Sequence, residues 1–192
     1  MAFRVGIVGL GMAVAPHAKS LLDLKDRVEV AYAYSPSAAR RKAFAEKFPF
    51  PLCDRLETIL EDRSVDAVLV LTPPNTHLDI VSRCAAAGKH VLLEKPLEIS
   101  TQRAEELVRK CTNVTLGIVL QHRFRPAVER LRDLLPSLGE LVSASAMIGN
   151  WRPQSYYDQP GRGARATAAA CFSRREYIPW TFSYLSAVKW LT

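Results

Sequence analysis

Phe3-Arg-Val-Gly-Ile-Val-Gly-Leu-Gly-Met-Ala-Val14 is an apolar segment that ends in a glycine turn just before a helical pattern begins. Gly9 allows a tight turn out of a strand, and Gly11 allows the backbone to approach a ligand closely. The amides that open the following helix would point at an anion held there. The segment therefore predicts a cradle for the pyrophosphate of a dinucleotide, although Val14 stands where a third small residue is usual.

A Gly-x-Gly turn can also be purely structural, so the residues that follow it matter. Apolar strand patterns occupy 3–8, 28–34, 65–71, 90–96 and 114–120, and the strands at 65–71 and 90–96 are expected to be buried. Helical patterns occupy 12–24, 54–61, 78–87 and 100–111, and a last helix ends near residue 138. This alternation predicts an α/β fold with a doubly wound parallel sheet, and residues 141–148 predict the first strand of a different, one-sided sheet.

Composition describes a globular protein with an ordinary core. The chain has 192 residues, 48% of them hydrophobic, and a mean hydropathy of −0.01. Its apolar runs are too short for a membrane span, and its start lacks the pattern of a signal peptide. The four cysteines contain no Cys-x-x-Cys pair, so we expect neither a metal site nor a disulfide framework, and we predict a cytoplasmic protein.

The formal net charge of +7 is concentrated near the C-terminal end. From Gly161 onward only Glu176 opposes the basic side chains, which are Arg162, Arg165, Arg174, Arg175 and Lys189. The sequence shows no basic stripe interleaved with aromatic residues. The charge therefore favours a solvated surface over nucleic-acid binding.

The end of the second predicted strand bears on the choice of cofactor. An acidic residue there would bind the adenosine ribose and select NAD, whereas arginines and hydroxyl groups accommodate the 2′-phosphate of NADP. The chain offers Ser35, Ser37, Arg40 and Arg41 instead of an acid, and this pattern favours NADP over NAD. In the alternative interpretation Ser35 is a helix N-cap followed by Pro36, and the arginines are solvated.

Two further segments follow predicted strands, where a doubly wound sheet forms its ligand crevice. Thr72-Pro-Pro-Asn-Thr-His77 would lie beside the cofactor, or would be a rigid turn with Asn75 capping the next helix. In Glu94-Lys95-Pro96 the proline keeps Lys95 out of helical geometry and makes a cis bond possible. A buried lysine there could exchange protons near neutral pH, although such a triplet is more often an exposed corner.

These motifs together, with Gln121-His-Arg-Phe-Arg125, resemble the glucose-fructose oxidoreductase and inositol dehydrogenase (Gfo/Idh/MocA) family from residue 3 to about residue 163. The resemblance implies a Rossmann domain at 1–121 and the start of an α+β substrate domain at 122–163. It also implies an NAD(P)-dependent oxidoreductase that moves a hydride to or from a sugar- or polyol-like hydroxyl carbon.

The resemblance also assigns site residues. Lys95 would assist proton transfer as the catalytic residue, with Glu94 beside it at the nicotinamide. The cofactor-binding residues would be Gly9, Gly11, Met12, Ser35, Arg40, Thr72, Pro73, Asn75, His77, Glu94, Lys95 and Arg123.

From residue 164 onward the sequence departs from the family. The family's glycine turn and His-bearing helix do not follow, and residues 164–192 fit neither a strand ladder nor a helical stripe. Back-translation in a frame displaced near codon 166 spells Asp-Gly-Gly-Gly-Val-Leu-Leu-Thr-Gln-Gly-Ile-His-Thr-Leu-Asp-Leu, which resembles that turn and helix. We therefore expect a truncated, frameshifted second domain with a poorly packed tail, and a chain that is catalytically incomplete.

Two other functions stay open at this point. A non-catalytic dinucleotide-binding module needs the glycine cradle but not Lys95. An interaction fragment would self-associate through the exposed tail or an unpaired sheet edge.

Overall fold

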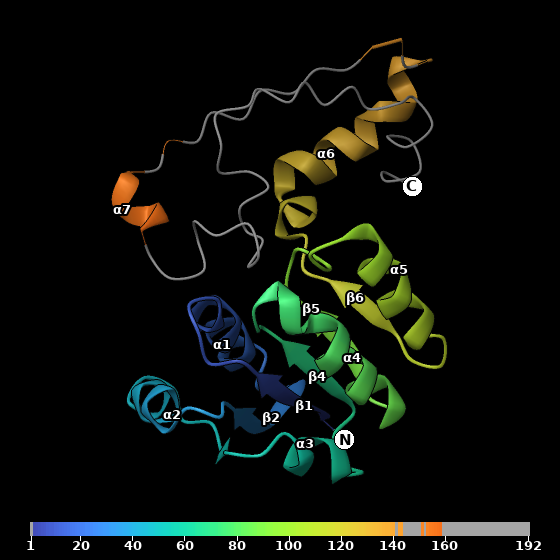
Figure 1. Ribbon diagram of the computed structural model, residues 1–192. Coiled ribbons are helices and arrows are strands. Elements are labelled where there is room, and N and C mark those ends of the chain that lie inside the picture. Colours follow the sequence, from blue (N-terminus) through green and yellow to red (C-terminus); the bar gives the residue numbers. More distant parts are fainter. Residues whose placement is uncertain (1, 141, 144–150, 152, 159–192) are drawn as a thin grey trace.

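Six parallel strands form one sheet in the computed structural model, which describes residues 2–140, 142–143, 151 and 153–158. The strands are β1 (Phe3–Val8), β2 (Val28–Tyr34), β3 (Leu52–Cys53), β4 (Ala67–Val70), β5 (His90–Leu93) and β6 (Leu116–Ile118). Their order is β3-β2-β1-β4-β5-β6 (Figure 1). The chain thus reverses its direction of travel across the sheet between β1 and β4, and in such sheets the ligand crevice lies outside the carboxyl ends of these strands.

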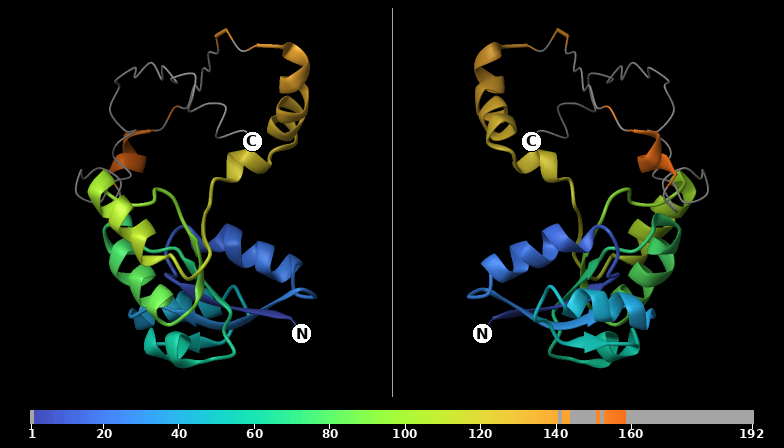
Figure 2. Two further views of the ribbon diagram at one scale, coloured as in Figure 1. Left: turned by 90° about the vertical axis from the view of Figure 1, so that its right-hand side faces the viewer. Right: turned by 90° about the vertical axis from the view of Figure 1, so that its left-hand side faces the viewer.

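Helices connect the strands and cover both faces of the sheet. They are α1 (Val14–Asp23), α2 (Ala38–Ala45), α3 (Glu57–Glu61), α4 (His77–Ala86) and α5 (Thr101–Lys110). The 3-10 turn η1 (Pro74–Thr76) precedes α4. After β6 follow η2 (Gln121–Phe124), α6 (Pro126–Leu134), η3 (Leu135–Leu138) and the short α7 (Gln154–Tyr157). Figures 1 and 2 show α6 rising away from the sheet beyond the end of β6.

Two hydrophobic clusters make up the core, one on each face of the sheet. On one face Val14 and Ala18 of α1 and Phe44 of α2 pack with Ile7 and Leu69 of the sheet. The other cluster joins strands β4 and β5 to helices α3, α4 and α5, and its fully buried members include Ile59, Val68, Val70, Val81, Leu93 and Leu107. Figure 2 shows α1 and the pair α4 and α5 on opposite faces. The predicted α/β doubly wound sheet is confirmed.

Several local predictions need correction. The strand at 90–96 is shorter and is buried on one face only: Val91 and Leu93 are buried, whereas Leu92 is 44% exposed. Ser37, not Ser35, is the N-cap of α2, because its hydroxyl oxygen accepts a hydrogen bond from the Arg40 amide. Asn75 does not cap α4, which begins directly from η1 without a side-chain cap.

Other predictions concern segments that the structure describes only in part. The predicted sheet strand at 141–148 has only residues 142 and 143 within the described part of the chain, and the predicted tail at 164–192 lies wholly outside it. No helix in the described part is long and apolar enough to cross a membrane.

Candidate active site at the carboxyl ends of the strands

Gly9 makes the turn that ends β1. Its φ is +105°, in a region that residues with side chains rarely adopt, and its amide donates to the Tyr34 carbonyl at 3.0 Å. A Cβ on Gly9 would lie 2.9 Å from the Leu71 carbonyl carbon and 3.0 Å from Cγ2 of Thr72. The turn is thus held between the ends of β2 and β4, where only glycine fits.

Gly11 lies beyond the turn with open space beside it, since a Cβ built there meets nothing within 4 Å. Helix α1 follows with neither a side-chain cap nor an acidic residue of its own in its first turn, so no side chain caps the amides that open the helix. Val14, unusual at its position, is 7% exposed and packs into the core cluster under α1. These features fit the pyrophosphate of a dinucleotide, which needs closely approaching backbone and a helix N-terminus.

At the end of β2 the structure distinguishes the candidate polar residues. Ser35 is 2% exposed and its hydroxyl oxygen accepts from the Ser37 amide at 3.3 Å, so the geometry argues against direct contact of Ser35 with a ligand. Arg40 is exposed on α2. Arg41 is half-buried, and its guanidinium donates to the Ser35 carbonyl at 2.6 Å. Arg41 is therefore the arginine held at the strand end, although the resemblance pointed to Arg40.

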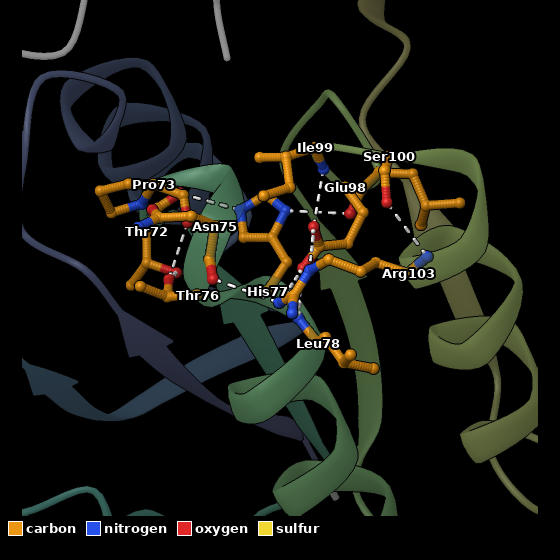
Figure 3. Close-up of polar contacts among 11 residues, drawn as sticks. Thr72, Pro73, Asn75, Thr76, His77, Leu78, Glu98, Ile99, Ser100 and Arg103 are labelled. Atoms are coloured by element: carbon orange, nitrogen blue, oxygen red, sulfur yellow. Dashed lines mark hydrogen bonds and ion pairs between the residues drawn. The ribbon is translucent and has the colours of Figure 1, made fainter. Parts of the chain in front are cut away.

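The loop after β4 is fixed by its own side chains. The Thr76 hydroxyl lies 2.8 Å from the Thr72 hydroxyl oxygen and 2.7 Å from the Pro73 carbonyl oxygen. His77 is fully buried, with Nε2 2.8 Å from the Thr72 carbonyl oxygen and Nδ1 3.1 Å from the Leu97 carbonyl oxygen (Figure 3). Because both ring nitrogens face backbone carbonyls, His77 holds this loop against the chain near Leu97, and its predicted place at the cofactor stays a prediction.

A buried carboxylate ties the same loop to the chain after β5 (Figure 3). The Glu98 side chain is 0% exposed, and it accepts hydrogen bonds from the amides of Leu78 and Ile99 and from the Arg103 guanidinium. Arg103 also donates to the Asn75 carbonyl at 3.3 Å. Burial raises the pKa of Glu98, but the hydrogen bonds from Arg103 and the two amides outweigh it and leave the pKa below its usual range. No sequence pattern predicted this network, because its acidic and basic residues look like ordinary surface residues in the chain.

The third strand end carries Glu94 and Lys95. The Glu94 amide continues the sheet by donating to the Val70 carbonyl at 2.9 Å. One carboxylate oxygen accepts the Lys95 amide at 2.8 Å, and the other lies 3.0 Å from Nε2 of His17 on α1. The Lys95–Pro96 bond is cis. Lys95 itself is exposed, which matches the exposed corner and not the buried lysine of the two sequence interpretations.

The structure thus brings most of the predicted site residues to one edge of the sheet. Gly9, Gly11 and Met12 follow β1, the loop from Thr72 follows β4, and Glu94 and Lys95 follow β5. Met12, Pro73 and Asn75 are exposed there, whereas Arg123 lies on η2 beyond β6. Within the described part of the chain, no three His, Cys, Asp or Glu side chains gather closely enough to hold a metal ion.

A family comparison agrees with this geometry. Residues 3–120 match the Gfo/Idh/MocA oxidoreductase family, NAD-binding Rossmann fold. The rhizopine catabolism protein MocA of Rhizobium meliloti is 30% identical over 194 residues, covering 99% of this chain and 57% of that protein. D-xylose 1-dehydrogenase (NADP(+)) 2 of Haloferax volcanii is 36% identical over 122 residues, covering 62% of this chain and 38% of that enzyme.

Solved structures also resemble this chain. KijD10, a 3-ketoreductase from Actinomadura kijaniata in complex with NADP and TDP-benzene, is 30% identical with a TM-score of 0.62. The match covers 71% of this chain and 43% of that one. The chain spans about half the length of the curated relatives that it matches.

Proposed function

Because the chain belongs to the Gfo/Idh/MocA oxidoreductase family with its NAD-binding Rossmann fold, we propose that it is the NADP-preferring, cofactor-binding part of a dehydrogenase for a sugar- or polyol-like hydroxyl carbon, and that it is catalytically incomplete by itself. Residues 1–121 would bind the dinucleotide, and residues 122–163 would begin the substrate domain. When bound, the nicotinamide supplies the hydride chemistry. The protein's residues hold the cofactor and handle the accompanying proton.

One observation carries the proposal: the glycine cradle after β1 and Lys95 after β5 lie at the same edge of one sheet, with only β4 between the two strands. Gly9 and Gly11 leave room for backbone to meet a pyrophosphate, and α1 presents an uncapped N-terminus to it. Glu94, packed against His17 of that helix, places Lys95 at the same edge. A cofactor that spans from the end of β2 across β1 to β5 would bring its nicotinamide to Lys95.

The preference for NADP rests on Arg41. Its guanidinium is anchored at the end of β2 by the Ser35 carbonyl, and residues 34–41 contain no acid to bind a ribose or repel a phosphate. An arginine fork is well suited to a phosphate group. The named NADP-dependent relative and the NADP-bound structure support this assignment.

Titration by the intrinsic fluorescence of NADPH and NADH tests the cofactor assignment. Arg41→Ala should weaken NADPH binding about tenfold, the equivalent of about 1.4 kcal/mol, and leave NADH binding nearly unchanged. Arg40→Ala, on the exposed side of α2, is the matched control. Equal binding of NADH and NADPH by the parent chain, or an equal effect of the two arginine variants, would contradict the NADP preference.

Turnover tests the enzymatic part. The full chain would be incubated with a panel of aldoses, inositols and other polyols while the absorbance of the reduced cofactor is followed. Turnover by this chain should be unmeasurable, because substrate must be held about 3–3.5 Å from the nicotinamide and residues 1–121 would form only the dinucleotide side of the site. If turnover is measurable, our expectation of an incomplete site is wrong, and Lys95→Ala should then lower kcat by about 10²–10⁴-fold as expected for a proton-transfer residue. Binding without turnover would also describe the alternative, a non-catalytic dinucleotide-binding module.

Localisation and self-association belong to the same proposal. The described cysteines Cys53, Cys84 and Cys111 are free thiols, which is compatible with a reducing cytoplasm. Strand β6 forms one edge of the sheet and supports pairing with a second copy. Sedimentation velocity across a range of protein concentrations tests the self-association.

A further inference from the structure

The Glu94 carboxylate joins two parts of the proposed site that are 77 residues apart in sequence. Oε1 lies 3.0 Å from Nε2 of His17, in the first half of α1, and Oε2 accepts the Lys95 amide at 2.8 Å. Both side chains of the His17–Glu94 pair are largely withdrawn from solvent, at 18% and 17% exposure. Neither the sequence patterns nor the resemblance assigned a role to His17.

The ionisation of Glu94 decides which side chain donates the hydrogen bond in the His17–Glu94 pair. Burial raises the pKa of Glu94, but the hydrogen bond from His17, the Lys95 amide and the nearby positive charge outweigh it and hold the pKa below its usual range. The carboxylate is therefore ionised near neutral pH and can only accept. Nε2 of His17 must carry the hydrogen and donate it.

The contacts of Glu94 also fix the backbone from which the Lys95 side chain extends. The Glu94 backbone is fixed to β4 through the Val70 carbonyl, and the Glu94 side chain is fixed to α1 through His17. The Lys95 amide is in turn fixed to the Glu94 side chain, so the point from which the exposed lysine extends is set relative to α1. The cradle for the pyrophosphate is the start of the same helix.

We propose that His17 is a positioning residue, which holds Glu94 so that the dinucleotide cradle on α1 and Lys95 after β5 keep one relative placement. This inference rests on the proposed function, since it concerns the placement of Lys95 against the bound nicotinamide. His17 does not touch the reacting atoms in this scheme. Its effect passes through Glu94.

Protection of Lys95 from chemical labelling by NADPH should change if His17 positions Glu94, but not if His17 only stabilises the fold. Full-length protein would be acetylated with a water-soluble N-hydroxysuccinimide ester, with and without saturating NADPH, and each lysine quantified by peptide mass spectrometry. In the parent chain NADPH should protect Lys95. In His17→Leu, which removes the donor at similar volume, NADPH affinity should be nearly unchanged because Gly9 and Gly11 are intact, but protection of Lys95 should fall by at least about threefold.

Two further variants and a control complete the test. His17→Gln, which can still donate to the carboxylate, should restore much of the protection. Glu94→Gln leaves one acceptor oxygen where two are used, so NADPH should protect Lys95 as poorly in this variant as in His17→Leu. This variant replaces His17→Leu in the test if the leucine variant does not fold. Lys19→Ala, on the exposed side of the same helix, should behave as the parent chain.

The outcomes separate this inference from the proposed function. Failure of the parent chain to bind NADPH would overturn the proposed function. NADPH binding by the parent with equal protection of Lys95 in His17→Leu and Glu94→Gln would overturn the role of His17 alone. Loss of protection at every lysine, with a lowered Tm, would show that His17 merely stabilises the fold.

Discussion

Alanine substitutions at the two glycines of the cradle should change different properties. Gly9→Ala should lower stability, whereas Gly11→Ala should weaken NADPH binding. At Gly9 the φ of +105° is strained for any residue with a side chain, at about 1–3 kcal/mol. The new methyl group would also lie 2.9 Å from the Leu71 carbonyl carbon, and relieving such overpacking costs about 1–3 kcal/mol more. Gly9→Ala should therefore lower the free energy of unfolding by about 2–6 kcal/mol, a large part of the total stability of a typical domain.

Gly11→Ala should leave stability intact and impair binding. No atom lies within 4 Å of the added Cβ and φ is not in the left-handed region, so the free energy of unfolding should be unchanged or slightly raised by the stiffer unfolded chain. The methyl group would occupy space proposed for the pyrophosphate. NADPH affinity should fall by at least about tenfold, or about 1.4 kcal/mol.

Urea denaturation followed by far-ultraviolet circular dichroism measures the stability of both variants. Circular dichroism is preferable to tryptophan fluorescence because Trp151, Trp180 and Trp190 all lie outside residues 1–121. NADPH fluorescence measures binding. The reasoning is refuted if Gly9→Ala lies within about 0.5 kcal/mol of the parent, the usual range for neutral surface changes, or if Gly11→Ala binds NADPH as the parent does.

Two further predictions concern buried groups near the site and in the core. Glu98→Gln should lower the free energy of unfolding at pH 7 by about 1–3 kcal/mol, because an amide nitrogen cannot accept the hydrogen bonds that one carboxylate oxygen now receives. Because folding lowers the pKa of Glu98, its contribution to the free energy of unfolding is complete above the usual glutamate pKa of about 4.3 and is lost as pH falls below it. The stabilities of parent and variant should therefore converge in acid, and a stability difference that does not change with pH would contradict the argument. Glu105→Gln, at an exposed side chain, is the control. Burial raises the pKa of Cys84 to about 12, so iodoacetamide at pH 8 should modify the half-buried Cys53 well before Cys84. Peptide mass spectrometry measures the two rates. Equal rates would show that the core opens more readily than its packing implies.

Local patterns in the sequence predicted much of the fold. Strands β1 and β2 were predicted with the bounds that the structure has, and Ser100 caps α5 where the helical pattern began. Gly88, with a φ of +71°, ends the predicted helix before β5. Such features depend on apolar periodicity and on the conformations that single residues allow, and both are present in the chain before it folds.

Element ends were predicted less well. The helix expected from residue 12 begins at Val14, and the strand expected to reach residue 96 ends at Leu93. The first follows from the length of the glycine turn, which packs against the ends of β2 and β4. The second follows from pairing, since β5 continues only as far as β4 and β6 offer partners.

The sequence by itself determined that the glycine cradle, the loop after β4 and Lys95 would meet at one edge of a parallel sheet, because strand and helix periodicity fix the order of elements and parallel connections bring their carboxyl ends together. Only the tertiary structure decided which side chains are supports and which are free to meet a ligand. His77 and Ser35 are buried, Lys95 is exposed, and Arg41 instead of Arg40 lies against the end of β2. Burial and hydrogen-bond partners depend on segments far apart in the chain, as His17 and Glu94 are, and no local pattern in either segment records the other.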